Sequence, residues 1–355
     1  MEDREPRSTV NLIQKNPYTP SWIDWLTDWI DKLPGSPWFY YLGLAVVILL
    51  LQAMVMWLEG VVPVGTIHRF QVFFAGVIAF FLAMFYYLDK WAGSALEKLK
   101  QELMVGEEKY RELCFQLTTL PMWSTILASL ILLVLNFISE LITGPYLPEA
   151  FAQYSISANI LRIIYLICWI LFGAFLYHTI HQLRMINHIY SNHTDINLFR
   201  MRPLYAFSNL SAFTAGSFAV IIYGFIAVNP GMQLNDPVLL VWILLFIISA
   251  LVAFVWPQLG MHRLQVAEQE RLLDEAYMRM EKAVARLHQQ VDEDDLEGME
   301  DLNFAIASLE IEVNSIKSVR TWPWEPETLQ ILVTALAFPL GLWFIQLILE
   351  RLFGA

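Results

Sequence analysis

The uncharged stretch WFYYLGLAVVILLLQAMVMWL, residues 38–58, decides the fold class of this chain. Because each residue of an α-helix advances about 1.5 Å, such a stretch crosses the roughly 30 Å of hydrocarbon in a bilayer. A backbone in lipid must satisfy its own hydrogen bonds, so a span of this kind is helical. Residues 38–58 therefore predict a membrane-spanning helix near the start of the chain.

Six further stretches have similar length and polarity. They are residues 70–88, 122–139, 163–180, 203–235, 238–258 and 328–349. The last contains Pro339 in its middle, so a re-entrant hairpin is the alternative to a kinked span there. The sequence predicts an all-α, polytopic protein of about seven transmembrane helices in a lipid bilayer.

The distribution of Lys and Arg predicts the orientation. If the seven spans alternate, 19 of the 22 Lys and Arg residues fall on the side that holds the N-terminus. Loops rich in Lys and Arg stay in the cytoplasm, so we expect a cytoplasmic N-terminus and an external C-terminus in a multi-pass protein of the plasma membrane. The net charge of −12 argues against a nucleic-acid partner, because phosphates require basic surface.

The polar segments divide the chain into four parts. Residues 1–37 form a cytoplasmic N-terminus with an amphipathic interfacial helix over 21–33, whose predicted apolar face carries Trp22, Trp25, Trp29, Ile30 and Leu33. Residues 38–258 hold six spans and a cytoplasmic helical insertion at 89–120, and residues 323–355 hold the last span. We place Asp24, Thr27, Asp28, Asp31 and Lys32 on the polar face of the interfacial helix.

Residues 259–322 predict a cytoplasmic antiparallel helical hairpin. Apolar residues recur at coiled-coil spacing from Leu273 to Val291 and again from Met299 to Ile316, with acidic residues at 292–295 between the two stripes. Packing of the stripes on each other is one interpretation. Contacts that join subunits into a homo-oligomer, or that bind a cytoplasmic protein partner, are the others.

Polar side chains within the spans are the candidate pore-lining residues. The fifth span supplies Asn209, Ser211, Thr214 and Ser217, and the last supplies Thr334, Gln346 and Glu350. The alternative for the fifth span is close helix packing, because its small residues recur every four positions. The alternative for the last span is hydrogen bonding between helices.

Charged and imidazole groups mark two further places. We expect Arg162 and Glu140 to form an ion pair at the outer side of the membrane. Four histidines gather near the inner side, namely His178, His181, His188 and His262. They could bind zinc or haem or sense pH, but the sequence predicts no bound metal and no cofactor, since interfacial histidines without a ligand are the simpler interpretation.

Common catalytic and nucleotide-binding motifs are absent from the sequence, so we do not expect an enzyme. The hydroxyl-rich fifth span and the proline-containing last span favour a homo-oligomeric ion channel or passive pore. The alternative is a membrane scaffold or sensor without transport activity, which docks partners through its cytoplasmic hairpin.

Overall fold

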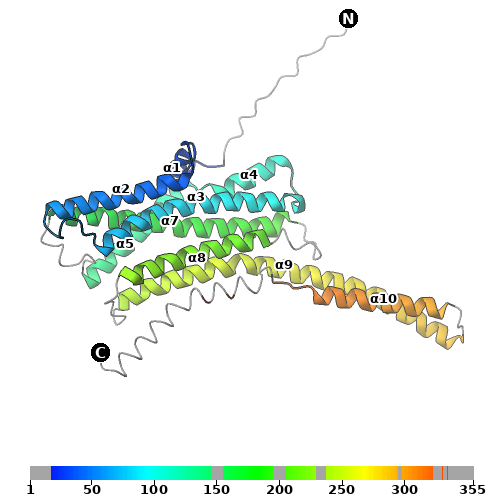
Figure 1. Ribbon diagram of the computed structural model, residues 1–355. Coiled ribbons are helices and arrows are strands. Elements are labelled where there is room, and N and C mark those ends of the chain that lie inside the picture. Colours follow the sequence, from blue (N-terminus) through cyan, green and yellow to red (C-terminus); the bar gives the residue numbers. More distant parts are fainter. Residues whose placement is uncertain are drawn as a thin grey trace, which may run out of the picture.

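The computed structural model describes residues 17–144, 155–194, 205–228, 237–294 and 298–322, together with Gln330 and Thr334. All regular structure in these ranges is helical, apart from two isolated β-bridges. The prediction of an all-α chain is therefore confirmed for the part that is described. Figure 1 shows the helices arranged as an elongated bundle from which one hairpin projects.

Six of these helices are long and apolar enough to cross a membrane. They are α2 (Pro37–Leu58), α3 (Arg69–Leu99), α5 (Met122–Thr143), α7 (Ser155–His193), α8 (Tyr205–Val228) and α9 (Pro237–Asp292). Five of them contain a predicted span in full, and α8 covers residues 205–228 of the predicted span 203–235. The seventh, residues 328–349, lies outside the described residues except for Gln330 and Thr334, so the count of seven stays a prediction.

The outer surface of the bundle is apolar. Leu50 on α2 and Leu130 on α5 have more than half of their side-chain surface exposed, and both helices carry many similar residues. Contiguous apolar surface of this extent is costly in water but ordinary in lipid. Together with the length of the helices, it makes the chain an integral, multi-pass membrane protein.

Three helices, α3, α7 and α9, are longer than the thickness of a bilayer requires. The 56 residues of α9 form one helix, so the boundary that the sequence suggests after residue 258 is not a break in the backbone. Its polar C-terminal part packs against α10 (Met299–Ser318) as an antiparallel hairpin (Figure 1). We call the end of the bundle that carries this hairpin the hairpin end, and the opposite end the far end.

The two arms of the hairpin bury a short apolar cluster where they leave the bundle, while Tyr277 and Val291 of the first stripe stay exposed. Ala276 of α9 and Val313 and Ile316 of α10 are buried between the arms, and Leu272 and Leu273 pack against them. Arg279 Nη1 lies 3.0 Å from Glu312 Oε1 across the pair. The hairpin therefore has its own small core.

The N-terminal helix α1 (Trp22–Asp31) packs on the bundle with a side that contains residues of both predicted faces. Ile23, Asp24, Thr27 and Ile30 are buried, whereas Trp25 is 70% exposed. The buried side therefore combines Asp24 and Thr27 of the predicted polar face with Ile30 of the predicted apolar face, while Asp28 stays exposed. Asp24 can be buried because it finds a hydrogen-bond donor in the bundle, and the exposed Trp25 and Trp29 are free to contact lipid.

A tight connection leads from α3 back into the membrane. The 3-10 turn η1 (Lys100–Glu102) ends α3, and Gly106 is the N-cap of α4 (Glu107–Thr118), which packs back along α3. Leu113 and Leu117 of α4 are buried in this contact. The helical insertion that the sequence predicts at 89–120 is therefore broken at Gly106 into two helices that pack together at the hairpin end.

Candidate functional site

A cavity of about 390 Å³ lies in the far-end half of the bundle, between α3, α5, α7, α8 and α9. Its wall contains nine aromatic side chains: Phe73, Phe74, Phe81, Tyr165, Trp169, Phe172, Phe225, Trp242 and Phe246. Bulky rings pack in pairs around it, with the rings of Trp169 and Trp242 4.4 Å apart. We call this cavity the far-end pocket, and its volume is typical of sites for small organic ligands.

One helix supplies the polar wall of the pocket. The four residues Asn136, Ser139, Glu140 and Thr143 of α5 line it, and their spacing places them along a single face of the helix. Tyr165 Oη of α7 donates a hydrogen bond of 2.6 Å to Asn136 Oδ1. Trp242 Nε1 of α9 donates one of 3.2 Å to Ser139 Oγ. These bonds fix the polar face of α5 toward the cavity.

Glu140 brings a carboxylate to the pocket wall. Its Oε2 lies 3.6 Å from Arg162 Nη2, and its Oε1 lies 3.5 Å from Asn136 Nδ2. Half of the Arg162 side chain is exposed, whereas the Glu140 side chain is mostly covered. The two residues that the sequence pairs at the outer side are thus neighbours, and Glu140 is the member that faces the cavity.

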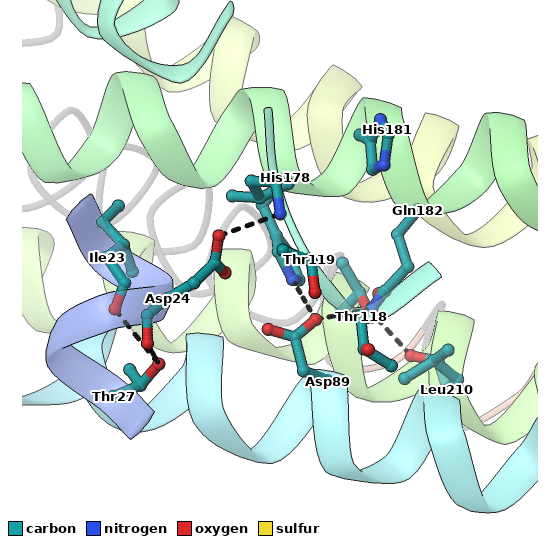
Figure 2. Close-up of polar contacts among 12 residues, drawn as sticks. Ile23, Asp24, Thr27, Asp89, Thr118, Thr119, His178, His181, Gln182 and Leu210 are labelled. Atoms are coloured by element: carbon teal, nitrogen blue, oxygen red, sulfur yellow. Dashed lines mark hydrogen bonds and ion pairs between the residues drawn. The ribbon is translucent and has the colours of Figure 1, made fainter. Parts of the chain in front are cut away.

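A second polar cluster lies at the hairpin end, where α1, α3 and α7 meet (Figure 2). His178 Nε2 of α7 lies 2.8 Å from Asp89 Oδ1 of α3, and Gln182 Nε2 donates to the same oxygen at 3.3 Å. His178 is 1% exposed. The pair ties α3 to α7 through a buried charge-assisted contact.

Asp24 anchors the N-terminal segment beside this cluster (Figure 2). Its Oδ2 accepts hydrogen bonds from the Ser21 backbone N–H and the Ser21 hydroxyl, both at 2.8 Å, and from the Leu120 N–H at 2.9 Å. Burial raises the pKa of Asp24, although these bonds and the nearby His178 oppose the rise. Tyr18 donates to the Thr119 carbonyl at 2.7 Å, so the segment is attached at two points.

The pore-lining candidates of the fifth span do not share one environment. Ser211, Thr214 and Ser217 are buried inside the bundle, and each donates to a backbone carbonyl four residues earlier in α8. Asn209 is exposed on the surface of the bundle. The hydroxyls therefore satisfy their hydrogen bonds within their own helix.

The candidates of the last span are described only in part. Thr334 is helical and exposed. Gln346 and Glu350 lie outside the described residues.

The four histidines have separate partners. His181 Nε2 donates to the Gln116 carbonyl at 2.7 Å, and His262 Nδ1 donates to the Thr321 carbonyl at 3.0 Å. His188 Nδ1 lies 2.8 Å from Asn192 Nδ2. Among the described residues, no three His, Cys, Asp or Glu side chains are grouped to hold a metal ion. The histidines that are near in sequence are thus used for different contacts.

Sequence reasoning missed Asp24, Asp89, Asn136 and Tyr165 as parts of polar clusters. Ser21 and Asp24 have capping-box spacing, which signals a helix N-terminus but not a contact with Leu120. The spacing from Asn136 to Thr143 was a usable signal, because four polar residues on one face of an apolar helix predict a polar wall. Asp89 and Tyr165 carried no comparable signal.

No protein-family model matches the chain, no curated protein is similar to it in sequence, and no solved structure matches it.

Proposed function

We propose that the protein is a membrane sensor that binds a small molecule in the far-end pocket and docks a protein partner through the α9–α10 hairpin. One observation carries this proposal: α9 belongs to both places. Trp242, Ile243 and Phe246 of α9 line the pocket, and the same helix runs on to Asp292 as one arm of the hairpin. A rigid helix transmits displacement along its length, so occupancy of the pocket can bias the position of the hairpin.

The hairpin surface suits a basic partner. Residues 265–318 contain 14 acidic residues and five Lys or Arg residues, a surplus of nine negative charges. Phe304 and Ile311 of α10 are both about two-thirds exposed and lie seven residues apart, on one face of the helix. Two apolar anchors within an acidic surface favour a basic amphipathic segment over a second, equally acidic copy of the hairpin.

Photo-crosslinking from positions 304 and 311 in cells tests the docking role. We expect one basic partner to be crosslinked, and its retention on the purified protein to fall with rising salt concentration and in the double variant Phe304→Ser, Ile311→Ser. Met104→Ser is the matched control, since Met104 is a similarly exposed apolar residue off the hairpin. The docking role would be contradicted if the double variant retained the partner as well as the wild type does, or if the only crosslinks were to other copies of this protein.

Filling the pocket tests the sensing role separately. Val77 of α3 lines the cavity, so Val77→Phe should occupy part of it. We expect the partner affinity to change at least about fivefold, the lower end of coupling energies between sites. An unchanged affinity with normal folding would leave a scaffold whose pocket is not coupled to the hairpin.

A homo-oligomeric ion channel or passive pore is the second candidate. It is favoured by polar side chains on the bundle surface, because exposed Asn209 and Thr334 would line a pathway only where subunits meet. Ion flux into liposomes tests it against empty liposomes. Asn209→Leu should alter flux through a pore between subunits, whereas Thr214→Leu should alter flux through a pore within one subunit. Flux no greater than in the controls would exclude a constitutively open pore.

A further inference from the structure

The far-end pocket has walls of two chemical kinds. Most of the lining is aromatic, and the remaining wall is the polar face of α5. A wholly apolar ligand, such as a lipid tail, gains nothing from a polar wall and would cover the Glu140 carboxylate, whose contacts within the protein are long, without offering it a hydrogen bond. The asymmetry therefore indicates an amphipathic ligand, with an aromatic or aliphatic body and one polar group directed at α5.

The charged side chains around the pocket decide the sign of that polar group. Glu140 lines the cavity, whereas its neighbour Arg162 is not among the lining residues. The contacts of Glu140 to Arg162 and Asn136, at 3.6 and 3.5 Å, are long for hydrogen bonds. A carboxylate accepts about four hydrogen bonds, so Glu140 keeps acceptor capacity for a ligand.

The aromatic lining adds to the preference for positive charge. The faces of Trp, Tyr and Phe rings carry negative potential and attract ammonium groups, Trp most strongly. Trp169 and Trp242 stand on α7 and α9, facing the cavity together with Tyr165. A carboxylate beside several such rings selects an organic cation over a neutral molecule, and it repels an anion.

We propose that the far-end pocket binds a small hydrophobic primary amine, with its ammonium group at Glu140 and its body among the aromatic rings. The proposal rests on the proposed function for the statement that the pocket is a sensing site, and it adds the chemical class of the ligand. Ser139 and Thr143 flank Glu140 on the same face of α5, so they help to orient the polar end of the ligand.

Three indoles with the same aromatic body test this class: tryptamine, the neutral alcohol tryptophol and the anion indole-3-acetate. The full chain is placed in nanodiscs of uncharged lipid, and binding is measured by equilibrium dialysis of the labelled indoles against empty nanodiscs. We expect tryptamine to bind at least about tenfold more tightly than tryptophol and indole-3-acetate to bind most weakly. Equal binding of all three, tightest binding of the anion, or binding of none would overturn the proposal.

Variants separate the carboxylate from general effects on folding. Glu140→Gln should abolish the preference for tryptamine over tryptophol while keeping the binding of tryptophol. Glu59→Gln is the matched control, because Glu59 lies at the same end of the bundle and does not line the cavity; it should keep the preference. Arg162→Gln should strengthen tryptamine binding, since it removes a competing cation. Loss of tryptamine binding in Arg162→Gln with normal thermal stability would overturn the assignment.

The result of the indole-binding experiment is independent of the result of the docking experiment. If no indole binds but the hairpin still retains its partner, the ligand class fails and the docking role stands. If tryptamine binds as expected but Phe304→Ser, Ile311→Ser retains every partner, the pocket stands and the docking role fails.

Discussion

Gly173 of α7 lies directly against the backbone of Ser129 in α5. A Cβ added at Gly173 would be 2.7 Å from the Ser129 Cα and 2.8 Å from the Ala128 carbonyl oxygen. The contact also includes a hydrogen bond of 2.9 Å from Ser129 Oγ to the Ile170 carbonyl. The two helices that carry Asn136 and Tyr165 of the far-end pocket are thus in direct backbone contact at a point that leaves no room for a side chain at position 173.

Gly173→Ala should push α5 and α7 apart. We expect a loss of roughly 1–3 kcal/mol in stability, the usual cost of overpacking, measured by thermal unfolding in detergent. Gly216→Ala in α8 is the control, because its added Cβ meets nothing within 4 Å. An Ala in place of Gly within a helix is favourable by about 1 kcal/mol at most. Similar melting temperatures for both variants would contradict the close contact.

Asp24 should give the docking of α1 a dependence on pH. Because the pKa of Asp24 is raised above its ordinary value of 3.8, its contribution to stability is fully present below pH 3.8 and is lost as the pH rises through the raised value. Each unit of pKa shift is worth about 1.4 kcal/mol. The melting temperature of Asp24→Asn relative to the wild type should therefore increase from acidic to neutral pH. A constant difference would show that the carboxyl has its ordinary pKa.

Asp24→Ala should be more damaging than Asp24→Asn at every pH. An asparagine oxygen can still accept from Ser21 and Leu120, whereas alanine leaves their donors unsatisfied in the interior. The cost is about 1–3 kcal/mol for each buried group without a partner. Hydrogen exchange of the α1 amides measures the loss of docking, and equal exchange in the two variants would exclude the role of the Leu120 contact.

The Asp89–His178 pair should behave as a coupled unit. Removing one partner of a buried hydrogen-bonded pair leaves the other unsatisfied at a cost of about 1–3 kcal/mol, and replacing both by apolar residues costs less. Asp89→Leu or His178→Phe alone should therefore destabilise the protein more than the double variant does. Chemical denaturation of the four proteins gives the coupling energy. Additive losses would mean that the 2.8 Å contact contributes nothing of its own.

Cysteine labelling tests the orientation predicted from Lys and Arg. In a variant without Cys114 and Cys168, exposed Val64 at the far end and exposed Asn314 on α10 are replaced singly by cysteine. A membrane-impermeant maleimide should label Val64→Cys in intact cells and Asn314→Cys only after permeabilisation. The reverse pattern would place the hairpin outside and invalidate the cytoplasmic docking proposal.

The far-end pocket shows where sequence reasoning stops. Glu140 and Arg162 could be paired from the sequence because both are charged and flank predicted spans on one side. The contact of Tyr165 with Asn136 could not be predicted from the sequence, since it depends on the rotation of α7 relative to α5. In an apolar helix every face is hydrophobic, so the amphipathic pattern that orients a helix in a soluble protein is weak. Rotation is then set by close packing, as at Gly173.

The sequence by itself determined that the chain is helical, where the first six spans lie, and that a polar hairpin follows the sixth. These features depend on length, polarity and backbone hydrogen bonding, all of which are local properties of the chain. Packing of the helices was needed to show that Asp24 faces the protein and that Trp25 and Trp29 of α1 face outward. It also placed Glu140 in an aromatic cavity and turned the hydroxyls of α8 inward. The direction in which a side chain points depends on partners that are distant in sequence, and their positions are fixed only when the helices pack.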